Sequence, residues 1–145
     1  MDLVHCIYCS AATNAALTPA ELDAILEVSR TNNAKAGITG MLLYQDGSFF
    51  QILEGDRAVV AALYDKIGCD KRHARVTKIV LESIEQRAFG EWTMGYPRVS
   101  RAQLAEIPGL NDFFTQRNSF MDLGEGRAKT LLAAFSEGRW RATIL

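Results

Sequence analysis

The chain has 145 residues, a formal net charge of −1 and 48% hydrophobic residues. This length fits one domain, and the hydrophobic content is sufficient for a core, which excludes a disordered chain. The balanced charge argues against a protein that binds nucleic acid by neutralising phosphates. No apolar run could span a bilayer, the N-terminus lacks the features of a signal peptide, and three cysteines are too few for a disulfide scaffold. A soluble, cytoplasmic protein is therefore expected.

The N-terminal part of the chain predicts a strand followed by a helix. Residues 3–9 form a short apolar run rich in strand-forming side chains, which is typical of a buried strand. Thr18 and Glu21 have the spacing of a capping box, so a helix is expected to begin here. Apolar residues at helical spacing give this helix one buried face, and it is expected to end near residues 32–33.

A hairpin, a second helix and two further strands are expected next. Asp-Gly at residues 46–47 separates two apolar runs, which is the pattern of a β-hairpin. Asp56 can cap the second helix, which is expected to extend to about Asp70. The strands expected after the first one are residues 38–45, 48–54, 76–84 and 92–96.

The resulting order, β-α-β-β-α-β-β, indicates an α+β fold of the ferredoxin-like kind. We expect a five-stranded mixed sheet with both helices on one face. Residues 1–98 are predicted as this domain, and residues 99–145 as a C-terminal extension of short helices without a core of its own. The apolar side chains of the extension are expected either to fold back onto the open face of the sheet or to serve self-association and partner docking. They are Phe113, Phe114, Phe120, Trp140, Ile144 and Leu145.

The cysteines and histidines do not predict a redox or metal site. Cys6 and Cys9 have C-x-x-C spacing, but side chains three apart in a strand point to opposite faces of a sheet. Both are therefore expected as buried side chains. The chain has two histidines, too few for a His-rich metal site, and His5 is expected as an ordinary strand residue.

Several polar residues occur where a core would normally have apolar ones. Tyr8 is in the middle of the first expected strand, Gln51 is in the middle of the third, and Asn32 and Asn33 close the first helix. A buried polar group without partners costs about 1–3 kcal/mol. Tyr8 and Gln51 could satisfy each other inside the core. Alternatively, these polar groups could hold a planar polar ligand between the two helices.

Five segments together resemble a BLUF domain, the flavin-binding sensor module for blue light, over residues 3 to about 97. The segments are Cys-Ile-Tyr-Cys-Ser around Tyr8 and residues 32–40, 49–55, 70–73 and 89–94. The resemblance implies a flavin bound noncovalently between the helices, usually FAD, with FMN or riboflavin as alternatives. It also implies that Asn33 and Gln51 hydrogen-bond the polar edge of the flavin ring, and that Ile25 and Ile67 pack on its faces. Further flavin contacts are expected from Asn32, Lys66, Asp70, Arg72 and His73.

The resemblance further implies a light-driven switch. Tyr8 would pass an electron and then a proton to the flavin through Gln51, and back-transfer would leave the Gln51 amide rotated or tautomerised. A stronger hydrogen bond to the flavin would shift its absorption slightly to the red, and the state would relax in darkness. Either Trp92 or Met94 could face the flavin, and their strand is expected to relay the switch to the C-terminal helices.

The leading functional hypothesis is a short photoreceptor that has no enzymatic activity of its own. It would signal to a protein partner and form a homo-oligomer, without contacting nucleic acid or membrane. Deletion of the residues after about 100 is expected to leave the photocycle and remove the output. Two other readings are a small flavin-dependent or acylphosphatase-like enzyme on the same fold, and an interaction module without a ligand.

Overall fold

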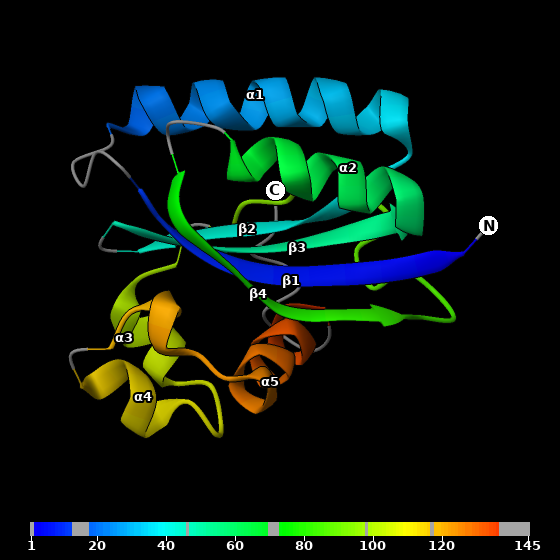
Figure 1. Ribbon diagram of the computed structural model, residues 1–145. Helices are drawn as coiled ribbons and strands as arrows, with labels where there is room; N and C mark the ends of the chain where they lie inside the picture. The colour runs from blue at the N-terminus through cyan, green and yellow to red at the C-terminus, as the bar shows by residue number, and fades with distance from the viewer. Residues whose placement is uncertain are drawn as a thin grey trace.

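The computed structural model describes residues 2–12, 18–45, 47–69, 73–97, 99–116 and 118–136. The sheet and its first helices are β1 (Leu3–Ala12), α1 (Pro19–Ala36), β2 (Thr39–Gln45), β3 (Ser48–Asp56), α2 (Arg57–Gly68) and β4 (His73–Ser83). The C-terminal elements are α3 (Arg101–Ala105), α4 (Asn111–Thr115), the 3-10 helix η1 (Phe120–Asp122) and α5 (Glu125–Ser136). The helices α1 and α2 cover one face of the sheet, and the C-terminal elements lie on the other (Figure 1). No helix in the described part of the chain is long and apolar enough to cross a membrane.

The strands pair antiparallel in the order β2-β3-β1-β4, so the described sheet has four strands and confirms an α+β fold. The prediction of a fifth strand at residues 92–96 is wrong. That segment makes a single parallel bridge from Gly95 to Met41 on β2, with Gly95 N donating to Gly40 O at 2.9 Å. It lies between a turn at Phe89–Trp92 and Pro97, which leaves too few residues for a ladder.

The capping box of α1 is confirmed, because the Thr18 hydroxyl accepts a hydrogen bond from Glu21 N and the Glu21 side chain accepts one from Thr18 N. The predicted end of this helix near residues 32–33 is wrong, since α1 continues to Ala36. It stops at Gly37, whose φ of 71° is left-handed and suits glycine. The helix passes through Asn33 because that side chain is buried and donates to another segment instead of competing for the helix backbone.

The start of α2 is also confirmed, because the Asp56 carboxylate accepts a hydrogen bond from Ala58 N at 3.3 Å. The helix ends at Gly68 with Cys69 as its cap, and the predicted end at Asp70 lies outside the described residues. The hairpin predicted around residues 46–47 is present as the antiparallel pair β2–β3.

Two apolar cores lie on opposite faces of the sheet, as strand alternation requires. Cys6 and Tyr8 belong to the core under α1 and α2, whereas Ile7 and Cys9 belong to the core that faces the C-terminal helices. The expectation that the two C-x-x-C cysteines are buried side chains is confirmed. Every residue of β3 except its last, Asp56, is buried, because both faces of this central strand are covered.

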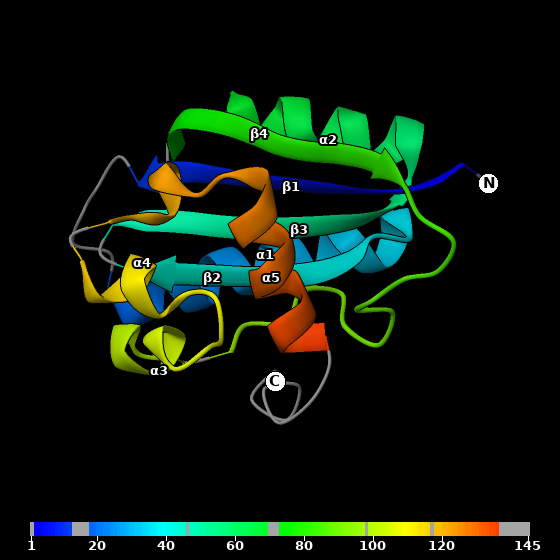
Figure 2. The same ribbon diagram turned by 90° about the horizontal axis from the view of Figure 1, so that it is seen from below.

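The C-terminal elements complete the second core. Figure 2 shows α5 crossing the lower face of the sheet beneath β3 and β2. Three phenylalanines of the extension are buried in this core, so folding back onto the open face is confirmed for them. They are Phe113, Phe114 and Phe120. The other apolar residues expected there, Trp140, Ile144 and Leu145, lie outside the described part of the chain.

Candidate ligand-binding site

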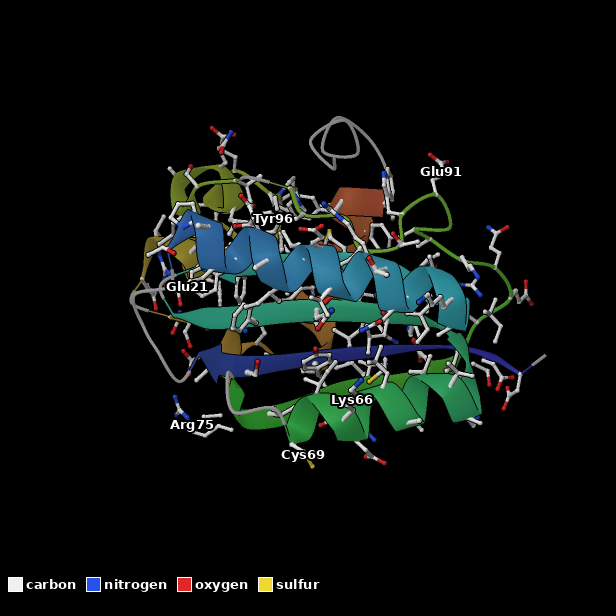
Figure 3. The ribbon with its side chains drawn as sticks, turned by 90° about the horizontal axis from the view of Figure 1, so that it is seen from above. Glu21, Lys66, Cys69, Arg75, Glu91 and Tyr96 are labelled. Carbon is white, nitrogen blue, oxygen red and sulfur yellow. The ribbon has the colours of Figure 1, made fainter. Side chains whose placement is uncertain are left out.

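A cleft opens between α1 and α2, with β2 and β3 as its floor. It encloses about 720 Å³ that no atom fills, counting its open mouth. The lining residues are Ile25, Val28, Ser29, Asn32 and Asn33 from α1, Leu42 and Phe49 and Gln51 from the strands, and Leu63, Lys66 and Ile67 from α2. Figure 3 looks down on this side of the molecule and shows Lys66 on the edge of α2 that faces α1.

The floor of the cleft brings together three residues from neighbouring strands. The register pairs Gln51 on β3 with Leu42 on β2 and with Tyr8 on β1. The Gln51 side chain is buried, and its residue is 7% exposed. Tyr8 is fully buried beside it, with its ring edge-on to that of Tyr64 at 5.5 Å between centroids. Tyr8 therefore lies in the core on the strand next to Gln51, which itself lines the cleft.

Residues 92–96, which follow β4 in the chain and run beside β2, place Met94 next to Gln51. Trp92 is not placed there. Met94 is 1% exposed and belongs to the core under α1 and α2. The Gln51 Nε2 group donates a hydrogen bond to the Met94 sulfur at 3.4 Å. Trp92 turns the other way and packs with Phe89, at 6.0 Å between ring centroids, against the opposite core.

The walls of the cleft combine apolar faces with polar groups. Ile25 from α1 and Ile67 from α2 are half-buried and line the cleft from opposite sides. Asn33 is buried and donates from Nδ2 to the Thr93 carbonyl at 2.8 Å. Asn32 and Lys66 are exposed at the mouth. These residues share the cleft because they recur at three- and four-residue spacing on their helices.

Three of the residues predicted to contact a ligand are not tested by the geometry. Asp70 and Arg72 lie outside the described residues, and His73 begins β4 with a side chain that is also outside them. The prediction from sequence missed several apolar lining residues, among them Val28, Leu42 and Leu63. Helical spacing from Ile25 identifies Val28, whereas the place of Leu42 depends on the pairing of β2 with β3.

The residues present fit a flavin. The two isoleucines offer apolar contact to both faces of a flat ring, and the amides of Asn33 and Gln51 offer both donors and acceptors to its polar edge. Lys66 at the mouth carries a positive charge that suits a phosphate group. Burial raises the pKa of the neighbouring Tyr64 phenol, so this phenol stays uncharged near neutral pH.

Comparisons with known proteins identify the family of the chain. The family model for BLUF, sensors of blue-light using FAD, matches residues 3–95. The photoactivated adenylate cyclase subunit beta of Euglena longa is 37% identical over 110 residues, which are 75% of this chain and 12% of that protein. The chain thus spans about an eighth of the length of that relative.

Two solved structures share the fold over most of the chain. BlsA in its photo-activated state has a TM-score of 0.80 and 28% identity, and the match covers 94% of this chain and 96% of that one. A bacterial light-regulated adenylyl cyclase has a TM-score of 0.68 and 36% identity, over 79% of this chain and 34% of that one. The chain therefore belongs to the BLUF family of blue-light sensors that use FAD.

Proposed function

We propose that this chain is a blue-light photoreceptor that binds a flavin, FAD in the first instance, in the cleft between α1 and α2. The observation that carries the proposal is the position of the Gln51 amide at the floor of the cleft, between Tyr8 and Met94. When bound, the flavin supplies the absorption of blue light and an excited state that accepts an electron. The protein supplies the donor, the switchable hydrogen bond and the path to the output.

The binding roles follow from the walls of the cleft. Ile25 and Ile67 hold the ring between two apolar side chains, and Asn33 and Gln51 hydrogen-bond its polar edge. Asn32 and Lys66 act at the mouth, toward the polar chain of the ligand. Asp70, Arg72 and His73 remain proposed contacts to that chain. FMN or riboflavin would use the same ring contacts, and FAD is proposed first because the description of the family model names it.

The switching roles belong to Tyr8 and Gln51. On illumination, Tyr8 would give an electron and a proton to the bound flavin, and the adjacent Gln51 amide would exchange its donor and acceptor ends. In the structure, the Gln51 N–H group donates to the Met94 sulfur, which is a weak acceptor. Because this acceptor is weak, the two orientations of the amide differ little in energy, but the buried Met94 must move for the amide to turn. A new hydrogen bond from the amide to the ligand would shift the absorption slightly to the red. Return of the electron and proton restores Tyr8, so the cycle is reversible.

Variants of the two residues test this proposal. Tyr8→Phe removes the proton that is transferred, and Gln51→Leu removes the amide. Both variants should bind flavin and lose the light-induced red shift. Tyr64→Phe is the matched control, because Tyr64 touches the Tyr8 ring but is not paired with Gln51; it should keep the shift. A Tyr8→Phe or Gln51→Leu protein that still cycles like the parent would contradict these roles.

We further propose that the signal leaves through the segment around Met94 and the C-terminal helices to a separate protein, and that the chain catalyses no reaction of its own. The names of two relatives, a photoactivated adenylate cyclase subunit and a light-regulated adenylyl cyclase, support a light-dependent output. Homo-oligomer formation is part of the proposal, and light scattering in the dark and after illumination tests it. A monomer in both states would contradict self-association.

A further inference from the structure

Arg30 on α1 lies outside the cleft lining but reaches the segment that carries Met94. Its Nε group donates a hydrogen bond to the Met94 carbonyl at 2.9 Å. One turn further along α1, Asn33 donates to the Thr93 carbonyl at 2.8 Å. Two side chains of the same helix face therefore hold two consecutive carbonyls of a segment about 60 residues away in the chain.

The opposite side of this segment is held by the edge strand β2. Gly40 N donates to the Trp92 carbonyl at 3.1 Å, and Leu42 N donates to the Gly95 carbonyl at 2.8 Å. Met94 lies between these two bonds, in a stretch that is too short to form a strand. Its main chain is thus fixed from β2 on either side and by Arg30 at its own carbonyl.

The two α1 side chains are not equivalent. Asn33 is a lining residue whose amide takes part in the proposed ligand site, whereas Arg30 is not a lining residue. The Arg30 guanidinium is charged, and its bond to Met94 is partly buried, so this bond is stronger than a neutral one.

We propose that Arg30 is a positioning residue, which fixes the Met94 main chain so that the Met94 sulfur stays in contact with the Gln51 amide. This inference rests on the proposed function, because it gives Arg30 a role in the same switch. Met94 and Gln51 are both buried, so the amide cannot rotate unless Met94 moves. Loss of the Arg30 bond frees Met94, lowers the barrier to amide rotation and shortens the lifetime of the light-adapted state.

The first test is made in the dark and needs no photocycle. The four methionines of the full chain are labelled with ¹³C at the methyl group, and Met94→Leu identifies the Met94 signal. Arg30→Ala should move or broaden this signal, and Arg30→Lys, which retains a cationic donor, should restore most of it. Arg57→Ala is the control, since Arg57 pairs with Asp2 at the surface, away from the cleft. An unchanged Met94 signal in Arg30→Ala would overturn the proposal.

The second test is the rate of dark recovery of the flavin-loaded protein. Arg30→Ala should accelerate recovery about fivefold or more, given the strength of a charged hydrogen bond, and Arg57→Ala should not. In a background without Met94, either Met94→Ala or Met94→Leu, the added Arg30→Ala change should have almost no effect, because Arg30 acts through Met94. The proposal would be overturned if Arg30→Ala recovered at the parent rate or more slowly. It would also be overturned if Arg30→Ala gave the full acceleration in the background without Met94. A parent protein with no red shift would instead refute the proposed function, and the methyl signal would still decide the placement of Met94.

Discussion

Phe120 in η1 joins the C-terminal helices to the sheet, and its truncation tests that connection. The residue is 1% exposed, and its ring centroid lies 5.8 Å from that of Phe50 on β3 and 6.0 Å from that of Phe114 on α4. Replacing a fully buried phenylalanine with alanine removes its apolar contacts and leaves a cavity, which costs about 3–5 kcal/mol. We expect Phe120→Ala to lower the free energy of unfolding by this amount, out of a total of about 5–15 kcal/mol for an ordinary domain.

The assay is urea unfolding of the full chain, followed in parallel by far-UV circular dichroism and tryptophan fluorescence. Both probes should report one transition, because the sheet and the C-terminal helices share a core. Phe120→Leu should lose only about 1–1.5 kcal/mol, since it retains most of the buried volume. Neither variant should change the red shift, because Phe120 packs on the face of the sheet opposite the cleft. A loss below about 1 kcal/mol in Phe120→Ala, or an early separate transition of the helices, would refute the shared core.

Two further predictions concern titratable groups. Burial raises the pKa of the Cys6 thiol to about 11, whereas the Cys69 thiol is exposed. A disulfide reagent at pH 8 should therefore modify Cys69 rapidly and Cys6 only after unfolding. Rapid labelling of Cys6 in the native protein would contradict its buried position. The hydrogen bond from His5 lowers the pKa of Glu82 below its ordinary 4.5, so Glu82 stabilises the fold above about pH 5 and loses this contribution as the pH falls through the lowered pKa. The effect should be at most about 1 kcal/mol because the Glu82 side chain is 42% exposed, and Glu82→Gln should flatten this part of the stability profile.

The structure also changes how the C-terminal extension should be tested. The predicted division at residue 98 treats the extension as separable, but its phenylalanines complete the core on the second face of the sheet. Deletion after about residue 100 would expose that apolar face, so loss of the photocycle in a truncated protein would reflect unfolding and aggregation. Point substitutions at exposed positions of α5, such as Arg127 and Lys129, assayed by partner binding, separate output from stability better than a deletion. The division itself stays a prediction.

Local sequence signals were sufficient for most of the fold. The Thr18–Glu21 capping box and the Asp56 cap depend on residues within one helical turn, and both are present in the structure. The hairpin between β2 and β3 follows from its turn residues. The alternation of side chains in a strand was enough to place Cys6 and Cys9 on opposite faces. Each of these features is set by neighbours in the chain, which a single sequence contains.

Features that depend on distant contacts were missed or left open. The segment at residues 92–96 has strand-forming side chains, but it meets β2 through one bridge because a turn and Pro97 limit its length. Which of Trp92 and Met94 lies next to Gln51 depends on the geometry of that segment. Glu54, expected as part of a strand, has a fully buried carboxylate that accepts hydrogen bonds from Ala88 N and Phe89 N. No pattern in the sequence pairs such residues, which are more than 30 positions apart.

The candidate site likewise contains residues that the sequence identified and residues that it did not. The polar residues Tyr8, Gln51 and Asn33 were conspicuous in sequence because each interrupts an apolar environment, and all three are buried at or beside the cleft. Arg30 was not conspicuous in the sequence, because an arginine on a helix surface is ordinary and its partner carbonyl is 64 positions away. The stripe of α1 that lines the cleft was only partly recognised, since half of it is apolar and resembles a core face.

The most direct test of the account is the absorption spectrum of the full chain, purified in darkness with FAD present and recorded before and after blue light. We predict a bound flavin whose absorption shifts slightly to the red on illumination and returns in the dark, with Tyr64→Phe behaving like the parent and Gln51→Leu failing to shift. A chain that binds no flavin when FAD is added, or a bound flavin that only bleaches, would contradict it.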